Sequence, residues 1–234
     1  MTSTKPVYLL AGGEWRRPRA LVPLLKAVLA AAGKPRPRVA YVGAASGDSK
    51  AFLTAMRKLL VAAGAGKVVL AKLASEAADR DEAADVLRSA DVVFVSGGDV
   101  DEGMRWLDRH DMVPCLREVH AAGAVMFGIS AGSIMLGTQW VRWRDPDDDD
   151  TAELFDCIGI APVLCDTHAE DDGWVELEAA VKLEGRKGVG YGIPSGGALV
   201  VGPDGELSAL AKPVVCLRAR GGKVARGEDV VPAP

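Results

Sequence analysis

The stretch AVMFGISAGSIMLG, residues 124–137, joins an apolar run to a segment of small and apolar residues. Its first half is typical of a buried strand, and its second half is compatible with a helix. Between them, Gly128, Ser130 and Gly132 match the pattern G-x-S-x-G, in which a serine lies at a tight bend between strand and helix. The glycines are explained by crowding, because the residues two before and two after such a serine come close together. Ser130 is therefore either a nucleophile on the bend or a residue that only caps the helix.

The same alternation of strand and helix runs through the first 140 residues. We expect strands at 7–13, 38–45, 67–73, 91–98 and 124–130. Apolar residues at helical spacing predict helices at 19–33, 48–64, 74–90, 101–109 and 112–123. The strands are continuous apolar runs, which favours a parallel sheet covered on both faces. The pattern predicts an α/β fold, a doubly wound, mostly parallel sheet sandwiched by helices.

Glycines mark three of the predicted strand ends. Ligands of such sheets bind outside the carboxyl ends of the strands. The turns at Gly12–Gly13, Gly97–Gly98 and Gly128–Gly132 fall at these ends. We therefore expect them to gather at one edge of the sheet.

The pattern changes after residue 140. Residues 140–156 hold a run of acidic side chains and little periodicity, which predicts an exposed excursion. Residues 163–168 are typical of a strand that ends at a histidine, and 174–185 of a helix. Short strands with glycine-rich turns follow. Because no long linker and no repeat is present, we expect one domain over residues 1–234.

Composition excludes several classes of protein. The 234 residues are 49% apolar and 26% charged, as in ordinary globular proteins, and the net charge is −4. No basic patch indicates a nucleic-acid partner, and no apolar run reaches the roughly 20 residues of a membrane helix. The first residues do not resemble a signal peptide, which favours a cytoplasmic location. The four cysteines form no CxxC pair and no zinc pattern, so we expect reduced thiols and no metal.

A serine nucleophile needs a base, and the chain has three histidines. His168 follows an apolar run, which places it at a sheet edge and makes it the natural base; the alternative is an exposed loop histidine. His110 lies in a polar junction between helices. His120 lies near a helix C-terminus, where a cation is mildly favoured.

The base in turn needs an acid that orients it. The acidic residues between the serine and the histidine are Asp145, Asp147 to Asp150, Glu153, Asp156 and Asp166. An acidic run is usually a solvated loop. Asp166 shares a face with His168 in an extended run, although a neighbour so close in sequence rarely approaches the imidazole from behind.

These residues together suggest a family. GISAGS after AVMF, the upstream turn VSGGD, a single histidine downstream and the late segment YGIPSGGALVV resemble the dipeptidase E and cyanophycinase group of serine peptidases. The resemblance covers roughly residues 7–202. It implies a class I glutamine amidotransferase-like fold, with serine where the amidotransferases carry cysteine.

The resemblance also implies roles for particular residues. Ser130 would be the nucleophile and His168 the base. Asp145, fifteen residues after the serine, would be the acid in place of Asp166. The backbone N–H groups of Gly98 and Ala131 would form the oxyanion hole, which agrees with the general expectation for a nucleophile elbow.

Two segments depart from the family pattern. An arginine-bearing segment after the histidine is replaced by AEDDGW, residues 169–174, and an acidic pair is replaced by Pro194–Ser195. An acidic segment would repel the aspartyl substrates of dipeptidase E. A preference for peptides with basic or neutral N-terminal residues is the resulting hypothesis.

The sequence thus favours a cytoplasmic serine peptidase acting on small peptides without metal or organic cofactor. The altered segments leave a second interpretation, an inactive binding or regulatory protein of the same fold. A third, nucleotide binding at LLAGGEW (9–15), lacks the known phosphate-binding patterns. We expect no nucleic-acid and no membrane partner. A homo-oligomer is possible, since the tryptophans in 105–107 and 141–143 could be interface residues or partly buried ones.

Overall fold

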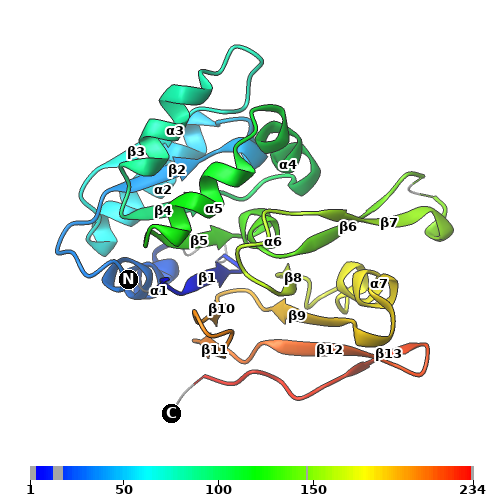
Figure 1. The fold of residues 1–234 in the computed structure, drawn as a ribbon. Helices are drawn as coiled ribbons and strands as arrows, with labels where there is room; N and C mark the ends of the chain where they lie inside the picture. The colour runs from blue at the N-terminus through cyan, green and yellow to red at the C-terminus, as the bar shows by residue number, and fades with distance from the viewer. Residues whose placement is uncertain (1–3, 13–17, 146, 233–234) are drawn as a thin grey trace.

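The computed structural model describes residues 4–12, 18–145 and 147–232 (Figure 1). Seven strands form the central sheet: β1 (Val7–Leu10), β2 (Val39–Val42), β3 (Val68–Ala71), β4 (Val92–Val95), β5 (Val125–Ile129), β10 (Ala198–Val201) and β11 (Leu207–Leu210). Their order is β11-β10-β1-β5-β4-β2-β3. Strands β1, β5, β4, β2 and β3 are parallel to one another. Strand β10 runs antiparallel to β1, and β11 runs antiparallel to β10.

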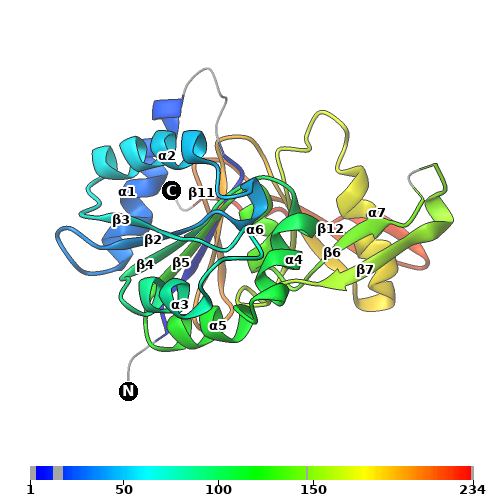
Figure 2. The same cartoon turned by 90° about the horizontal axis from the view of Figure 1, so that it is seen from above.

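Helices cover both faces of this sheet (Figure 2). One face carries α1 (Val22–Ala31) and α2 (Lys50–Ala63); the other carries α3 (Arg80–Arg88), α4 (Val100–Arg109), α5 (Val113–Ala121) and α6 (Ala131–Leu136). Strand β4 shows why the central strands are continuously apolar. Val93 and Val95 pack toward one face, and Val92 and Phe94 toward the other, where the Phe94 ring stacks on Phe127 at 4.5 Å. Because both faces of β4 are buried, none of its four positions carries a polar side chain.

The later part of the chain adds a second sheet beside the first (Figure 1). Its strands are β8 (Leu164–Thr167), β9 (Val189–Ile193), β12 (Val215–Arg220) and β13 (Lys223–Arg226), in the order β13-β12-β9-β8. Strands β8 and β9 are parallel, and the other neighbours are antiparallel. Helix α7 (Val175–Leu183) connects β8 to β9 and packs on this sheet.

A two-stranded hairpin projects from the body between the two sheets. It consists of β6 (Gln139–Trp143) and β7 (Ala152–Asp156), which pair antiparallel. The turn between them includes the short helix η3 (Asp149–Thr151); three other 3₁₀ turns are η1 (Pro18–Leu21), η2 (Ala44–Ser46) and η4 (Gly185–Lys187).

The predicted fold class, a doubly wound and mostly parallel sheet with additional C-terminal strands, is confirmed. The prediction for residues 140–156 was incomplete, because this excursion contains two paired strands, β6 and β7. Its strands are held by Trp140 and Val141, which are buried against the body, and by cross-strand pairs such as Arg142 with Glu153. The acidic run occupies only the turn, and this masked the periodicity of the flanking strands.

Strand boundaries also differ slightly from expectation. Strand β1 ends at Leu10, and Gly13 of the predicted first turn lies outside the described residues. The apolar cluster on the α4 and α6 face of the central sheet continues through β8 to α7, which supports our proposal of one domain over 1–234. None of the helices in the described part of the chain is long and apolar enough to cross a membrane.

Candidate active site

Ser130 lies at the bend between β5 and α6. Its backbone has φ 55° and ψ −127°, a conformation that costs a non-glycine residue about 1–3 kcal/mol and persists only when the surroundings impose it. Two hydrogen bonds do so here. The Ser130 N–H donates to the Leu10 carbonyl at 2.9 Å, and the Ser130 carbonyl accepts from the Ser133 N–H at 2.8 Å. The first bond ties the bend to the end of β1.

The two flanking glycines are required by packing. A Cβ on Gly128 would lie 2.3 Å from the Ser133 nitrogen, and a Cβ on Gly132 would lie 2.0 Å from the Val95 carbonyl oxygen. Neither position has room for a side chain. The crowding inferred from the sequence is therefore present, and the serine stands on a bend that is packed from both sides.

His168 follows β8 directly and faces this serine. Its backbone also has a positive φ, 49°, and its N–H donates to the Ile193 carbonyl at 2.9 Å, which fixes the end of β8 against β9. The Nε2 atom lies 2.7 Å from the Ser130 Oγ. A neutral imidazole with its proton on Nδ1 accepts the serine hydroxyl in this geometry. Ser130 is half-buried and His168 is exposed.

The other two histidines lie elsewhere and bind backbone carbonyls. Nε2 of His110 is 3.0 Å from the Ser75 carbonyl oxygen, and Nδ1 of His120 is 3.2 Å from that of Ala124. Burial lowers the pKa of His120. Both contacts are structural, as the sequence suggested for these two positions.

The turn after β4 lies beside the serine. A Cβ on Gly97 would be 3.7 Å from the Ser130 Oγ, and a Cβ on Gly98, whose φ is 145°, would be 1.8 Å from the Ala45 carbonyl oxygen. Only glycines allow the backbone to approach this closely. Within the described residues, neither the Gly98 N–H nor the Ala131 N–H donates a hydrogen bond.

Buried polar groups support this turn from below. The Oγ of Ser96, which is fully buried, lies 3.3 Å from the Ser46 Oγ and donates to the Gly97 carbonyl at 3.3 Å. The Asp99 N–H donates to the Ala45 carbonyl at 2.8 Å. The turn is thus bonded to the loop after β2, and two of the three predicted glycine turns meet at Ser130. Gly12 lies close by, since a Cβ there would be 3.4 Å from Ile129.

Asp145, the predicted acid, lies in the exposed turn after β6. Its N–H donates to the Thr151 Oγ1 at 3.0 Å, and its Oδ1 accepts from the Asp147 N–H at 3.1 Å. The structure does not bring it to the imidazole. Among the described residues, the His168 ring has a hydrogen bond with Ser130 alone.

Asp166 is buried on β8, two residues before the histidine. Its Oδ1 accepts from the Thr167 N–H at 2.6 Å, and its Oδ2 has no partner among the described residues. Burial, together with the charges of Glu176 and Asp172, raises the pKa of Asp166 to about 7. Its carboxyl does not hydrogen-bond to His168 either. Among the described residues, the imidazole therefore has no carboxylate as a hydrogen-bond partner in this conformation.

The two segments that depart from the family pattern meet next to the histidine. The Glu170 Oε1 accepts from the Ser195 N–H at 2.9 Å. Partial burial would raise the pKa of Glu170, but the hydrogen bonds from Ser195 and the charge of Lys212 outweigh it and lower the pKa. The sequence indicated both segments as unusual, but nothing in it showed that they touch.

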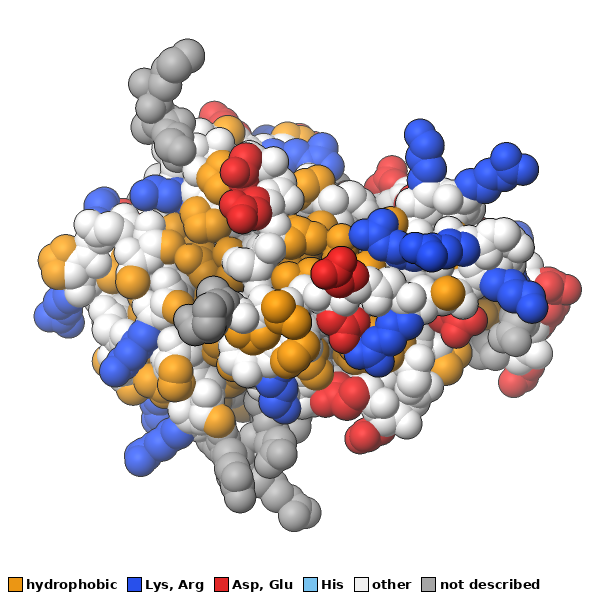
Figure 3. Space-filling model, turned by 90° about the horizontal axis from the view of Figure 1, so that it is seen from below, with side chains coloured by type: hydrophobic (Ala, Val, Ile, Leu, Met, Phe, Trp, Pro, Cys, Tyr) orange, Lys and Arg blue, Asp and Glu red, His pale blue; other side chains and the backbone are white. Residues whose placement is uncertain are grey.

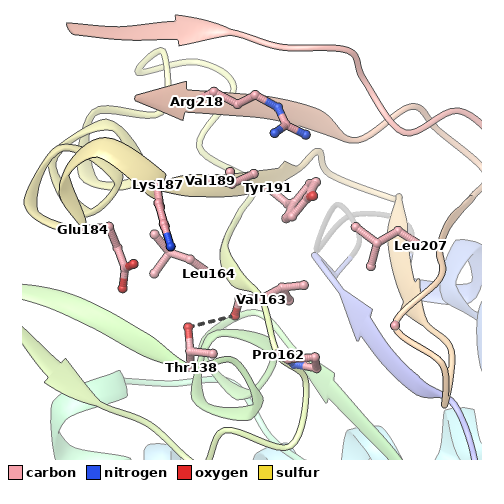
Figure 4. A pocket seen from close by; sticks show the side chains of 11 residues that line it. Thr138, Pro162, Val163, Leu164, Glu184, Lys187, Val189, Tyr191, Leu207 and Arg218 are labelled. Atoms are coloured by element: carbon pink, nitrogen blue, oxygen red, sulfur yellow. Dashed lines mark hydrogen bonds between the residues drawn. The ribbon is translucent and has the colours of Figure 1, made fainter. Parts of the chain in front are cut away.

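Two cavities in the structure lie away from this pair. The first, of about 430 Å³, opens at the amino ends of β8 and β9, opposite to His168 (Figure 4). Its lining includes Leu164, Val189, Tyr191 and Arg218. The second, of about 710 Å³, lies between α7 and the β12–β13 turn. Since neither includes Ser130 or His168, neither defines the candidate active site.

An α/β sheet that presents a serine on a strand-to-helix elbow, with an imidazole at 2.7 Å, has the architecture of a serine hydrolase. The family model of peptidase family S51 matches residues 7–207. The chain belongs to this family, the dipeptidase E family of serine peptidases.

Solved structures agree on the fold. A peptidase from an acI-B1 Actinobacterium superposes with a TM-score of 0.72 at 17% identity, covering 98% of this chain and 97% of that one. A protein assigned as peptidase E from Listeria monocytogenes EGD-e superposes with a TM-score of 0.63 at 19% identity, covering 92% and 99%. Among curated proteins, none matches the sequence significantly.

Proposed function

We propose that this serine peptidase hydrolyses small peptides through an acyl-enzyme on Ser130, with His168 as base and Asp145 as acid. The observation that carries the proposal is the 2.7 Å contact between the Ser130 Oγ and the His168 Nε2. The elbow adds weight, because two hydrogen bonds and two packed glycines hold the serine in a strained conformation. Such strain is typical of functional positions.

The reaction would follow the serine peptidase pathway. The Ser130 Oγ attacks the scissile carbonyl while the His168 Nε2 takes the hydroxyl proton. The imidazolium then gives this proton to the leaving amine, and the C–N bond breaks to leave an ester on Ser130. In the second half, His168 takes a proton from water, the water oxygen attacks the ester, and the proton returns to the serine as the acid product leaves.

The N–H groups of Gly98 and Ala131 are proposed as the oxyanion hole. They belong to the two backbone segments next to the serine Oγ, and neither is used within the described structure. Donors of this kind stabilise the negative charge that develops on the carbonyl oxygen in the transition state. Because Ser96 and Ser46 support the Gly97–Gly98 turn, its position is fixed before substrate binds.

Asp145 is proposed as the acid because it lies fifteen residues after the serine, the place that the resemblance to the dipeptidase E group implies for the acid. The role requires the Asp145 carboxylate to lie against the imidazole in the working enzyme, a contact that this conformation lacks. Asp166 is the alternative. It is nearer in sequence, but its pKa of about 7 leaves it partly protonated at neutral pH, which suits a partner of an imidazolium poorly.

A matched pair of serines tests the proposal. Ser130→Ala removes the hydroxyl that contacts His168, whereas Ser133→Ala removes a buried one that donates to the Leu10 carbonyl at 2.8 Å. We expect Ser130→Ala to lower kcat for peptide hydrolysis by about 10⁴–10⁶ and Ser133→Ala to retain most of it. Equal activity of the wild type and Ser130→Ala would refute the assignment.

We further propose a preference for peptides with basic or neutral N-terminal residues. The support is Glu170, which the lowered pKa keeps ionised and which follows His168 by two residues and accepts from the Ser195 N–H. A carboxylate at this place would repel an acidic side chain of the substrate. A panel of dipeptides that differ only in the first residue tests this; selective cleavage of Asp-Xaa peptides would contradict it, and Glu170→Gln should flatten the preference.

A binding protein without activity is the second candidate, and the observation that favours it is the imidazole without an acid partner. A folded sample that cleaves no member of the panel would support this candidate. Calorimetric titration with the same dipeptides would then show whether the site binds them.

A further inference from the structure

A basic groove lies at the end of the second sheet. The cavity of about 710 Å³ between α7 and the β12–β13 turn is lined by four cationic side chains and no acidic one. The cations are Lys182, Arg186, Arg220 and Lys223. Figure 3, seen from the side of β12 and β13, shows several Lys and Arg side chains toward this end of the molecule, with Asp and Glu side chains among them.

Among the described residues, no carboxylate lining the groove balances the charges of these four cations. Some arginines elsewhere are paired: Arg80 pairs with Asp111, Arg109 with Glu76, and Arg142 with both Asp101 and Glu153. None of the four groove residues forms an ion pair with any described residue. In a chain of net charge −4, four unpaired cations around one hollow form a strong local site for negative charge.

The turn of the β6–β7 hairpin carries acidic side chains that form no ion pair with described residues. Asp147 and Asp150 are exposed, and their carboxylates form no hydrogen bond or ion pair with a described residue. The Asp148 carboxylate accepts the backbone N–H of Asp150, and its backbone carbonyl accepts from Thr151. The arginine nearest in sequence, Arg144, pairs with Glu153 on β7 and not with the turn. The described residues thus present an acidic turn whose carboxylates form no ion pair and a basic groove whose lining includes no carboxylate.

Both features lie at the same end of the molecule, on either side of α7. Figures 1 and 2 agree that the hairpin and the β12–β13 turn project in the same direction from the central sheet. Helix α7 contacts both hairpin strands and both β12 and β13. It also carries two of the exposed large apolar side chains, Val175 at 59% and Leu183 at 44% exposure. An apolar centre with charged flanks is the usual composition of a protein interface.

We propose that this end of the molecule binds a second copy of the chain, with Asp147, Asp148 and Asp150 of each copy seated at the basic groove of the other. If one turn meets the partner's groove, a two-fold axis makes the reciprocal contact identical, so the assembly closes as a dimer. Opposite charges meet at both contacts, and α7 packs near the axis. This proposal does not depend on the proposed catalytic roles.

Sedimentation velocity on charge-reversed variants tests the interface. The wild type should sediment as a dimer of twice 24.5 kDa. Arg186→Glu/Arg220→Glu and, separately, Asp147→Lys/Asp150→Lys should each weaken dimerisation at least about tenfold. An equimolar mixture of the two variants should restore one of the two contacts and form a heterodimer. Added salt should weaken the wild-type dimer, because exposed charges are screened within about 8 Å at physiological ionic strength.

The matched control is Arg57→Glu/Lys58→Glu, which reverses two exposed and unpaired cations on α2, away from the hairpin end. It should dimerise like the wild type, and circular dichroism should show all variants folded. A wild type that stays monomeric at low salt overturns the proposal, as does a dimer that both reversals leave intact. An open series of larger species overturns the two-fold arrangement. Binding of an acidic peptide by a monomeric wild type would assign the groove to another partner.

Discussion

The elbow at Ser130 and the turn at Asp145 are supported in opposite ways. The elbow is held by the Leu10 carbonyl and by two glycines whose positions admit no side chain. The turn is exposed and is held by its own residues, chiefly Thr151. The nucleophile and base are thus preorganised by the sheet, whereas the proposed acid is carried by a projection. We therefore expect positions in the elbow to tolerate almost no substitution. Positions in the turn should tolerate changes of side-chain shape, but not loss of the Asp145 carboxylate.

The largest expected effect comes from filling the elbow. Gly132→Ala places a Cβ 2.0 Å from the Val95 carbonyl oxygen, so the backbone of β4 or α6 must shift. We expect the free energy of unfolding to fall by more than about 3 kcal/mol and peptide hydrolysis to be lost. Urea unfolding and kcat measure the two.

Gly205→Ala is the matched control, since its φ is 83° but open space surrounds it. The positive φ alone should cost about 1–2 kcal/mol and leave kcat unchanged. Equal losses for the two variants would show that crowding at the elbow is unimportant.

The next effect concerns the turn. Asp145→Asn keeps the size of the side chain and removes its charge, and we expect kcat to fall by about 10⁴ because the imidazolium loses its partner. Asp147→Asn in the same turn should be silent. A large loss in Asp166→Asn with none in Asp145→Asn would move the acid to β8 and contradict the assignment.

The buried carboxyl of Asp166 offers a further test, because its titration should make the free energy of unfolding depend on pH. Its pKa is about 7 in the folded chain and near the ordinary value of about 3.9 when unfolded. Between these values the folded state binds more protons, so the free energy of unfolding falls as pH rises, by a few kcal/mol in all. Urea unfolding at about pH 5 and about pH 8 should show this fall in the wild type and not in Asp166→Asn.

The exposed neighbour Asp171 supplies the control. Asp171→Asn should keep the wild-type pH dependence. Parallel curves for the wild type and Asp166→Asn would mean that the carboxyl is ionised in the folded chain throughout this range, contrary to its burial.

The sequence predicted the sheet and the elbow because both follow from local pattern. Continuous apolar runs predict β1 to β5. The spacing of Gly128, Ser130 and Gly132 predicts the crowding around the serine. His168 was predicted as the base because it follows an apolar run. These features need no knowledge of distant parts of the chain.

What the sequence left open depends on contacts between distant segments. Pairing of β8 with β9 places His168 opposite Ser130, and no local pattern specifies that pairing. The same holds for Glu170 with Ser195, which lie 25 residues apart. The partner of the imidazole is the clearest case, because an acidic run marks a solvated turn equally well whether or not one of its members acts in catalysis.

The central claim is that Ser130 is a nucleophile activated by His168, and covalent labelling tests it most directly. A fluorophosphonate probe should modify the chain once, and mass spectrometry of the digested protein should place the label on Ser130. Labelling should vanish in Ser130→Ala, fall steeply in His168→Ala and persist in Ser133→Ala. A folded wild type that takes no label, or a label that persists in Ser130→Ala, would contradict the account.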